Sequence, residues 1–467
     1  MAYFLDKIRA TPDHVAFQSD TERATHQQLS EKIAFFEQWL TQNEVGPGRV
    51  VSFDGDYSLE SIALFLALTN NRNIVVPLSL DSHHHFEEFR HIACTEFDIS
   101  LNTPAQNGLN APSDTESGSS VSGPRLTHTG RCSDQTLYQE LRKENAPGLV
   151  LFSSGSTGKS KAIVQNLNKL MSKFSVPRPS LRMLIFLQLD HIGGVNSLLY
   201  ALANQGTVIK AEGRTPELVC AAIERHRAEL LPTSPTFLNL ILLSKAYEHH
   251  DLSSLKVITY GTEPMQESTL HRLQTCLPTV RLQQTYGLSE VGILRSKSRG
   301  DGSLWMKIGG DEFDVKITDG TLRIKADSAM LGYLNAPSPF DEDGYMDTGD
   351  IVEQDGDWIR ILGRASEIIN VGGFKVFPAE IESVLLEMDN VEDVVVFGEN
   401  HPITGKIVTA QFKLIEPETT RSLKGRMMIY CKDKLPSYKT PSKISITDQN
   451  SYNERFKRMR RRDSATH

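Results

Sequence analysis

The chain has 467 residues, a length that suits two or three domains. Its 50 Lys and Arg against 58 Asp and Glu give a net charge of −8, a poor balance for a dedicated nucleic-acid binder, and no apolar run approaches the roughly 18–20 residues that span a bilayer. Five scattered cysteines without a CxxC pair, and an N-terminus without the plan of a signal peptide, predict a cytoplasmic protein.

The first part of the chain alternates apolar runs with amphipathic ones. Residues 149–153 (LVLFS), 183–187 (MLIFL) and 256–260 (KVITY) read as buried strands, and a helical pattern follows at 265–276. This alternation predicts α/β layers. Residues 103–135 contain no Ile, Phe, Trp, Tyr or Met, so they lack the apolar surface that would offset their ordering entropy. We expect a flexible surface loop there.

A β-rich texture begins near residue 313. Residues 314–325 (DVKITDGTLRIK) predict a hairpin with its turn at Asp319 and Gly320, and a second turn is expected at Asp355 and Gly356. Beyond residue 362 the balance of charge changes, because residues 363–467 hold 17 basic and 14 acidic residues. We therefore predict an N-terminal domain of residues 1–362 and a small C-terminal domain of residues 363–467.

A glycine-rich loop, SSGSTGKSK (153–161), follows the strand at 149–153. Small residues let backbone N–H groups approach a phosphate, and hydroxyls and lysines add donors and charge. The loop is no Walker A motif, because Ser153 stands where that motif needs its first glycine. Taken alone, the pattern leaves a phosphate loop and a plain surface turn both open.

The loop resembles the phosphate loop of the adenylate-forming superfamily, which contains acyl-CoA synthetases, peptide-synthetase adenylation domains and luciferases. Ser160 replaces the family's proline, and Lys161 holds its lysine position. Six more stretches are similar to family motifs in the family's order: LQLDHIGGV (187–195), YGTEP (260–264), QTYGLSE (284–290), GYMDTGD (344–350), ILGRASEIINVGGFKVFPAEIE (361–382) and LPSYKTP (435–441). On these seven ordered matches the chain is identified as a member.

The resemblance implies ATP and Mg²⁺ as ligands and assigns a role to each matched residue. Glu290 and Thr157 would bind Mg²⁺, and Ser289, which replaces the family's threonine, would bind the α-phosphate. Asp350 and Arg364 would hold the ribose. The loop residues would hold the β- and γ-phosphates: Ser153, Ser154, Gly155, Ser156, Thr157, Gly158 and Lys161. The adenine side would be formed by Gly261, Thr262, Glu263, Tyr286 and Gly287. Gly372 and Gly373 would line the channel of the incoming nucleophile.

The C-terminal tail departs from the family pattern. Lys457 aligns with the lysine that bridges the carboxylate and the α-phosphate, but the family's proline and glycine are missing and Phe456 holds the glycine position. A solvated basic tail or a weak nucleic-acid patch is the alternative reading. Arg455 and Lys439 are substitutes for Lys457. At the hinge, Ser366 stands where the family carries Asp or Lys.

The resemblance places the acid pocket near His191, which is counted with the catalytic residues because it would cover the carboxylate entrance. A structural histidine is the alternative. The expected lining is mixed apolar and small: His191, Gly194, Ser234, Phe237, Thr262 and Ile293. No charge there marks an amino-acid substrate, and Asp190 is the nearest candidate. A carboxylic acid without an α-amino group is therefore predicted, either alkyl or aryl.

The predicted function is that of an ATP-dependent acid ligase that forms an acyl-adenylate and passes the acyl group to a thiol, with CoA as co-substrate. The alternatives are an amide ligase of the coronafacate ligase type, with an amino acid or other amine as acceptor, a ligase that loads a carrier protein, and a non-catalytic acyl or nucleotide sensor. The expected fold is a large α/β domain of layered subdomains with a small β-rich piece, followed by a small mobile α+β domain, with the site between them.

Overall fold

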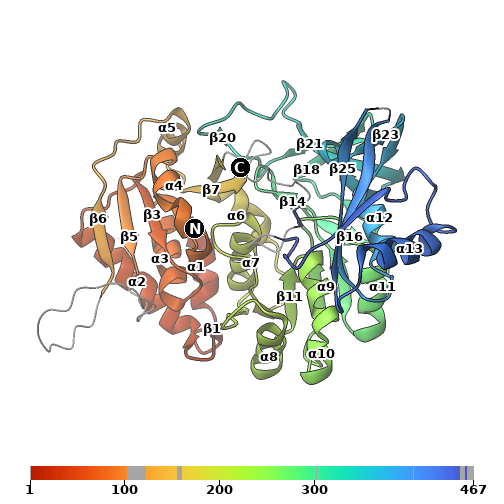
Figure 1. The fold of residues 1–467 in the computed structure, drawn as a ribbon. Coiled ribbons are helices and arrows are strands. Elements are labelled where there is room, and N and C mark those ends of the chain that lie inside the picture. The colour runs from red at the N-terminus through yellow and green to blue at the C-terminus, as the bar shows by residue number, and fades with distance from the viewer. Residues whose placement is uncertain are drawn as a thin grey trace, which may run out of the picture. The chain divides into compact units, whose positions relative to one another are not determined.

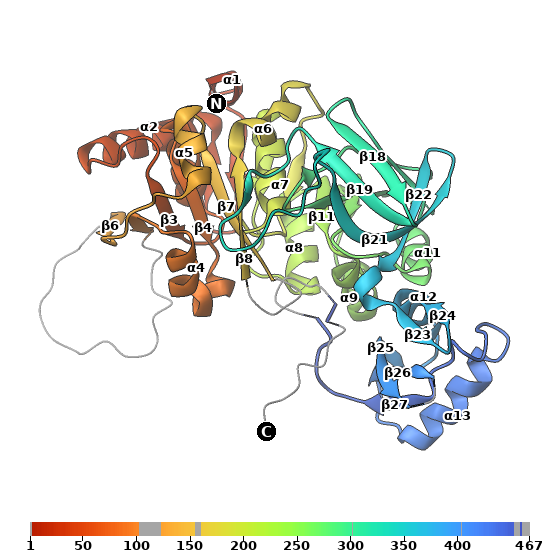
Figure 2. The same cartoon turned by 90° about the horizontal axis from the view of Figure 1, so that it is seen from above.

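The computed structural model describes residues 2–101, 123–154, 160–300, 302–402, 404–452 and 458–459 (Figures 1 and 2). The chain forms two compact units. Unit 1 consists of residues 1–212, 288–293 and 327–338, and unit 2 consists of residues 213–287, 294–326 and 339–467. The mixed α/β class agrees with the prediction. The division at residue 362 stays a prediction, because the units cut the chain elsewhere.

The main sheet of unit 1 has parallel central strands and antiparallel edges. In spatial order its strands are β20 (Gly332–Tyr333), β8 (Ser160–Asn166), β7 (Gly148–Ser154), β4 (Ile74–Leu78), β3 (Val50–Asp54), β5 (Phe97–Ser100) and β6 (Arg125–His128). Strands β7, β4, β3 and β5 run parallel. Strand β4 is wholly buried and β3 nearly so, which is why both read as continuous apolar runs.

Strand β6 corrects the prediction of an irregular segment at 103–135. Residues 125–128 pair antiparallel with β5, and residues 102–122 lie outside the described residues. The strand forms despite its polar sequence because the backbone of an edge strand pairs with its neighbour whatever its side chains are.

Helices and a second group of strands complete unit 1. Strands β9 (Arg182–Leu184), β10 (Thr207–Ile209) and β1 (Val15–Gln18) run parallel, and β2 (Arg23–Thr25) pairs antiparallel with β1. Strand β9 ends at Leu184, three residues before the predicted end. The helices are α1 (Ala2–Arg9), α2 (His26–Gln42), α3 (Leu59–Asn70), η1 (Leu80–His85), α4 (Phe86–Ile92), α5 (Thr136–Lys143), α6 (Leu167–Ser172), η2 (Lys173–Ser175) and α7 (Ile192–Ala203).

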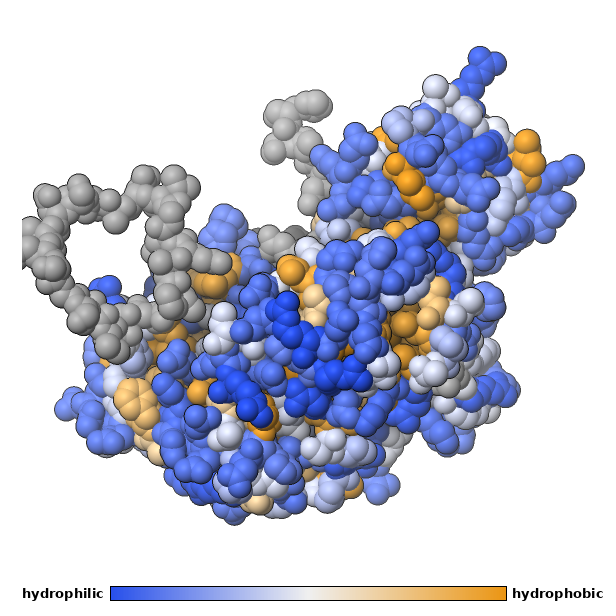
Figure 3. All heavy atoms as spheres, turned by 90° about the horizontal axis from the view of Figure 1, so that it is seen from below, coloured by the Kyte–Doolittle hydropathy of each residue, from blue (hydrophilic) through white to orange (hydrophobic). Residues whose placement is uncertain are grey.

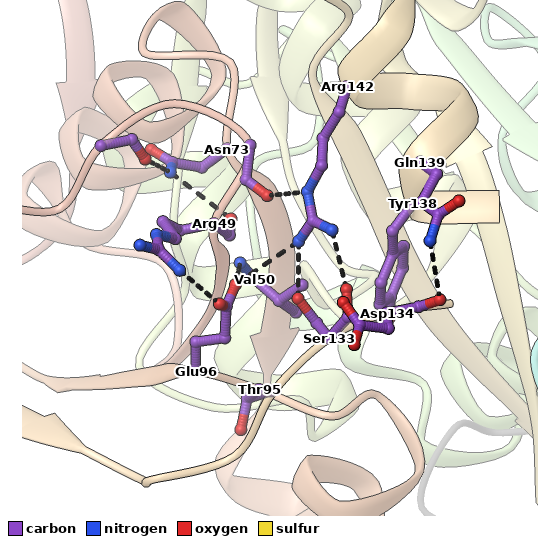
Figure 4. A network of polar contacts seen from close by, with 12 residues as sticks. Arg49, Val50, Asn73, Thr95, Glu96, Ser133, Asp134, Tyr138, Gln139 and Arg142 are labelled. Carbon is purple, nitrogen blue, oxygen red and sulfur yellow. Dashed lines mark hydrogen bonds and ion pairs between the residues drawn. The ribbon is translucent and has the colours of Figure 1, made fainter. Parts of the chain in front are cut away.

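An ion-pair network around the buried Glu96 fixes the segment that precedes helix α5 (Figure 4). Glu96 accepts hydrogen bonds from Arg49 Nη1 at 2.8 Å and from the backbone N–H of Val50 at 2.9 Å. Arg142 lies 3.6 Å from the same carboxylate and donates to the Ser133 carbonyl and hydroxyl at 2.7 and 2.6 Å. This Glu96 network therefore ties residue 133 and helix α5 to the edge of the sheet.

Unit 2 begins with parallel strands connected by helices. Strands β11 (Leu230–Thr233), β12 (Val257–Tyr260) and β13 (Arg281–Gln284) pair in that order. The helices are α8 (Pro216–His226), α9 (Pro235–Ser244), α10 (Ala246–His249) and α11 (Glu267–Cys276). The strand predicted at 256–260 and the helix predicted at 265–276 are confirmed, each within two residues.

An antiparallel sheet follows in unit 2. Its order is β16 (Ser296–Ser298), β17 (Met306–Ile308), β22 (Trp358–Arg364), β21 (Met346–Asp355), β19 (Thr321–Ala326) and β18 (Phe313–Thr318). Asp319 and Gly320 have φ of 53° and 77°, as a type I′ turn requires, so the predicted hairpin is confirmed. Asp355 pairs with Trp358, which places the second turn at Gly356 and Asp357, one residue later than predicted.

The C-terminal segment of unit 2 has its own hydrophobic core, which contains Phe412, Leu423 and Met427. Its elements are η3 (Ala365–Glu367), β23 (Ile369–Val371), β24 (Phe374–Val376), α12 (Pro378–Leu385), β25 (Val391–His401), β26 (Gly405–Leu414), α13 (Thr420–Cys431) and β27 (Lys443–Ile446). The expected α+β texture is present.

The face drawn in Figure 3 is mainly hydrophilic, with scattered apolar spots. None of the described helices is long and apolar enough to cross a membrane.

Candidate active site

Unit 2 brings three of the predicted nucleotide-binding residues into contact. Asp350 lies early in β21 and is buried, with 7% of its surface exposed. Its Oδ2 accepts a hydrogen bond from the Tyr286 hydroxyl at 2.5 Å, and its Oδ1 accepts one from Arg364 Nε at 3.2 Å. Asp350 and Arg364 are register partners on β21 and β22, so the hairpin itself places the pair.

Burial sets the electrostatics of this Asp350 cluster. It raises the pKa of Asp350 above the ordinary 3.8, and the Arg364 guanidinium opposes that shift. It also raises the pKa of Tyr286, which the neighbouring carboxylate reinforces. The tyrosine is therefore a neutral donor at physiological pH. The Arg364 side chain is 52% exposed. A carboxylate held in this way can accept hydrogen bonds from the hydroxyls of a ligand.

The turn after β12 carries backbone strain. Thr262 has a φ of +75°, a genuine outlier for a β-branched residue, and such strain collects at functional sites. A side chain at Gly261 would lie 2.7 Å from the Thr285 carbonyl oxygen, so the turn needs glycine there. Glu263 accepts a hydrogen bond from the backbone N–H of Thr236, in the first turn of α9, at 2.7 Å.

Unit 1 joins the predicted metal ligand to the phosphate-loop lysine through a residue that sequence reasoning missed. The Tyr333 hydroxyl donates to Glu290 Oε1 at 2.7 Å. Lys161 Nζ lies 5.0 Å from the centre of the Tyr333 ring, within cation–π range. Gln165 donates to the Ser289 carbonyl at 2.6 Å. Carboxylate oxygen is a ligand type that Mg²⁺ prefers, so Glu290 fits the ion.

The phosphate loop itself is described only at its two ends. Ser153 pairs with Lys161, and Ser154 pairs with Ser160, across the antiparallel strands β7 and β8. Gly155, Ser156, Thr157 and Gly158 lie outside the described residues, so their predicted roles stay predictions. The loop nevertheless leaves the carboxyl end of β7, a parallel strand of the sheet, which is where α/β folds bind ligands.

His191 caps helix α7. Its Nδ1 accepts the backbone N–H of Gly193 at 3.0 Å, so a neutral His191 carries its proton on Nε2. Gly194 is sterically required, because a Cβ there would lie 1.9 Å from the Gln188 carbonyl oxygen. Asp190 Oδ2 accepts the hydroxyls of Ser79 and Ser82 at 2.7 and 3.0 Å. These hydroxyls therefore engage the carboxylate of Asp190, the nearest candidate for binding an α-amino group.

The remaining predicted residues lie in turns and helix starts. Gly372 and Gly373, with φ of 56° and 91°, form the two-residue turn between β23 and β24. Ser234 caps α9, and Phe237 is fully buried in the first turn of that helix. Ile293 belongs to unit 1, as His191 and Gly194 do. Gly287 ends the first segment of unit 2.

Beyond residue 452 the structure describes only Arg458 and Met459, so Lys457 and Arg455 lie outside the described residues. Lys439 is paired with Glu380 at 2.6 Å, which makes it a weak substitute for Lys457. Nothing in the sequence pointed to Arg458, yet only 7% of its side chain is exposed, and its guanidinium contacts two carboxylates. Neither Tyr333 nor Arg458 carries a local signal, because their partners lie 43 and 195 residues away.

The family model described as "AMP-binding enzyme" matches residues 4–321, and the model "AMP-binding enzyme C-terminal domain" matches residues 380–457. The chain therefore belongs to the AMP-binding enzyme family, within the adenylate-forming superfamily. It is accordingly an ATP-dependent, AMP-forming acid ligase.

Three curated relatives illustrate the family. The 3-[(3aS,4S,7aS)-7a-methyl-1,5-dioxo-octahydro-1H-inden-4-yl]propanoyl:CoA ligase of Mycobacterium tuberculosis is 26% identical over 94% of this chain and 93% of that protein. Acyl-CoA synthetase 7 of Caenorhabditis elegans is 31% identical over 64% of this chain and 61% of that protein. The 4-coumarate-CoA ligase 1 of Narcissus pseudonarcissus is 30% identical over 56% of this chain and 54% of that protein. The matches therefore cover nearly all of the first relative and little more than half of the other two.

Solved structures show the same fold. The o-succinylbenzoate CoA synthetase of Bacillus subtilis, in complex with its acyl-adenylate intermediate, has a TM-score of 0.75 at 20% identity, covering 100% of this chain and 98% of that chain. The amide bond synthetase of Marinactinospora thermotolerans has a TM-score of 0.72 at 19% identity, covering 96% of this chain and 95% of that chain.

Proposed function

We propose that the protein activates an organic acid without an α-amino group as its acyl-adenylate and transfers the acyl group to the thiol of CoA. The observation that carries the first step is the buried Asp350, whose two carboxylate oxygens are held by Tyr286 and Arg364. Each oxygen can accept one more hydrogen bond, so the pair matches the two hydroxyls of a ribose. The relatives from Mycobacterium tuberculosis and Narcissus pseudonarcissus are CoA ligases, which supports the second step.

In the first step a carboxylate oxygen of the acid bonds to the α-phosphorus of ATP, and the bond to pyrophosphate breaks. Two anions approach each other, so cations and donors aimed at the phosphate oxygens lower the barrier. Lys161 and the phosphate loop supply positive charge and N–H donors, and Lys457 bridges the carboxylate and the α-phosphate. Glu290 and Thr157 would hold Mg²⁺, which would supply positive charge beside the leaving pyrophosphate.

In the second step the thiol sulfur of CoA bonds to the acyl carbon, and AMP leaves. The turn at Gly372 and Gly373 borders the path of the thiol in this proposal, and its surroundings are open, because a Cβ at either position would meet no atom of the described residues within 4 Å. The described cysteines are free, which agrees with a reducing compartment, and we place the protein in the cytoplasm.

End-point mass spectrometry tests this function. The purified protein is incubated with ATP, Mg²⁺ and a panel of alkyl and aryl acids, with CoA in one series and free amino acids in another. A product with the mass of an acyl-CoA supports the proposal and identifies the acid class. An N-acyl amino acid formed without CoA contradicts the CoA step and favours the amide ligase, an activity borne by the structural neighbour named above. Absence of AMP with every acid contradicts the adenylation step as well.

A further inference from the structure

The strand that leaves the phosphate loop, β8, is held on both of its sides at Lys161. Strand β8 pairs antiparallel with β7, where Lys161 is the register partner of Ser153. On its other side β8 pairs antiparallel with the short strand β20, which ends at Tyr333. The backbone N–H of Leu334 then donates to the Ala162 carbonyl at 3.0 Å. This bond brings the β20 segment up to the residue that follows Lys161.

The side chain of Asn335 extends this pairing past Lys161. Its Oδ1 accepts the backbone N–H of Ala162 at 3.0 Å, and its Nδ2 donates to the carbonyl of Ser160 at 2.8 Å. One amide group therefore bonds to both residues that flank Lys161, in the way that the backbone of a neighbouring strand would. Ser160 stands where the family carries proline, a residue that restricts its own backbone. Asn335 restrains the same residue from outside.

Strand geometry also decides what the lysine side chain meets. Tyr333 is the register partner of Ile163, which lies two residues from Lys161, so the tyrosine and the lysine share one face of the sheet. Lys161 Nζ lies 5.0 Å from the centre of the Tyr333 ring, and the Tyr333 hydroxyl donates to Glu290 at 2.7 Å. Within the part of the chain that the structure describes, no carboxylate forms an ion pair with Lys161. Its ammonium group is therefore available to an anionic ligand.

We propose that Asn335 is a positioning residue for Lys161: its amide fixes the backbone on both sides of the lysine and thereby strengthens the binding of the ATP triphosphate. The inference rests on the adenylation step of the proposed function, in which Lys161 binds the β- and γ-phosphates. A lysine side chain loses rotamer entropy when it binds a ligand, so a backbone that is fixed in advance lowers the total cost of ordering. The role has no local signal, because the two partners of Asn335 lie 173 and 175 residues away.

Nucleotide binding tests this role without turnover. The dissociation constants of ATP and AMP are measured by titration calorimetry with Mg²⁺ present and no acid, so that adenylation does not proceed. Asn335→Ala should raise the dissociation constant of ATP by about five- to tenfold, because two hydrogen bonds that order the lysine are lost. The constant of AMP should stay nearly unchanged, since AMP lacks the β- and γ-phosphates. A residue that only stabilised the fold would weaken the binding of both nucleotides alike, and that result would overturn the proposal.

A double variant shows whether Asn335 acts through the lysine. Lys161→Ala alone should weaken ATP binding by about tenfold or more and leave AMP binding nearly unchanged. If Asn335 acts by placing Lys161, the double variant should bind ATP as Lys161→Ala does, because the asparagine then has nothing left to position. Additive losses from the two substitutions would overturn the proposal, and so would wild-type affinities of Asn335→Ala for both nucleotides.

Asn390→Ala is the matched control. In the C-terminal segment the amide of Asn390 accepts the backbone N–H of Glu416 at 2.7 Å and donates to the carbonyl of the same residue at 3.0 Å. Asn390 has a φ of 63°, so alanine there adds backbone strain and should lower the Tm at least as much as Asn335→Ala does. The ratio of the ATP and AMP constants should nevertheless stay that of the wild type. A control that changed this ratio as much as Asn335→Ala would assign the effect to stability and overturn the proposal.

If Asn335→Ala does not fold, Asn335→Gln decides. Its amide stands one methylene further from the backbone, so it cannot make both bonds in the same geometry. A raised constant for ATP alone supports the proposal, and unchanged constants or equal changes for both nucleotides overturn it. The two proposals fail differently: a wild type that binds no ATP and forms no adenylate from any acid contradicts the proposed function. An active wild type with an Asn335→Ala variant that binds ATP equally well contradicts the role of Asn335 alone.

Discussion

Two clusters bury a carboxylate against arginine, and they differ in how far the carboxylate is saturated. In the Glu96 network both oxygens of Glu96 are engaged by Arg49, Arg142 and a backbone N–H (Figure 4). In the Asp350 cluster the carboxylate has only two side-chain partners among the described residues, a neutral tyrosine on one oxygen and a single arginine on the other.

The difference indicates what each cluster does. A carboxylate that faces two guanidinium groups and a backbone donor has its bonds filled by the fold itself, and it holds segments of unit 1 together. Burial raises the pKa of Asp350 by more than Arg364 and Tyr286 lower it, so the net shift is upward. Such a group gains when a ligand supplies further hydrogen bonds, which supports the binding role that we propose for the Asp350 cluster, whereas the Glu96 network stabilises unit 1.

The largest effect is expected for Asp350→Ala. In the proposed function Asp350 accepts charge-assisted hydrogen bonds from the ribose, each contributing about 1.5–3 kcal/mol. Their loss should lower kcat/KM for ATP in the exchange assay by about two orders of magnitude or more. The Tm should change little, because the lost bond to Arg364 is offset by removal of a poorly solvated charge. A large loss of Tm with normal exchange would assign Asp350 to the scaffold instead.

Glu96→Ala should show the reverse pattern. It removes the acceptor of two arginines and of the Val50 N–H, and we expect the free energy of unfolding to drop by about 2–3 kcal/mol. The loss in the free energy of unfolding is limited because both arginines are partly exposed and can be solvated by water in the variant. Denaturant unfolding measures the loss, and kcat of the folded fraction should stay within about twofold. Lost activity in a stable variant would contradict the comparison.

Tyr333→Phe tests the bond that connects Glu290 to Lys161. The variant keeps the ring beneath the lysine and loses the hydroxyl, so the Mg²⁺ concentration for half-maximal exchange should rise by about five- to tenfold, or about 1–1.4 kcal/mol. Tyr345→Phe is the control, because the Tyr345 hydroxyl also donates to a carboxylate, that of Asp314, on an exposed part of unit 2. If both variants need the same Mg²⁺ concentration for half-maximal exchange, the result would contradict a role of Tyr333 in the site.

The smallest effect concerns pH. Because burial raises the pKa of Asp350 above 3.8, its contribution to stability is present below pH 3.8 and lost as the pH rises through the folded value. The ionised form is nevertheless the one that accepts ribose hydroxyls. The ratio of AMP affinities between wild type and Asp350→Asn should therefore shrink as the pH falls, beginning above 3.8, while titration of the phosphate cancels in the ratio. A ratio independent of pH would contradict the role of the carboxylate.

The motifs predicted from the sequence agree with the structure where they are local. The hairpin at Asp319 and Gly320 forms because these two turn residues tolerate the positive φ that the turn requires. Strand β7 forms at the expected residues because a short apolar run must be buried to leave water. Strand β6 was missed, and the second turn was predicted one residue too early, because pairing with a neighbouring strand decided both.

The sequence by itself determined the family, the α/β class, the nucleotide and the identity of most candidate residues, because ordered motifs and periodicity are written along the chain. Only the tertiary structure decided which residues form hydrogen bonds and ion pairs with one another. Tyr286 bonds to Asp350 across 64 residues, Tyr333 to Glu290 across 43, and Arg458 to Glu263 across 195. Such contacts depend on which strands and helices become neighbours, and that is fixed by burial of the whole core rather than by any local pattern.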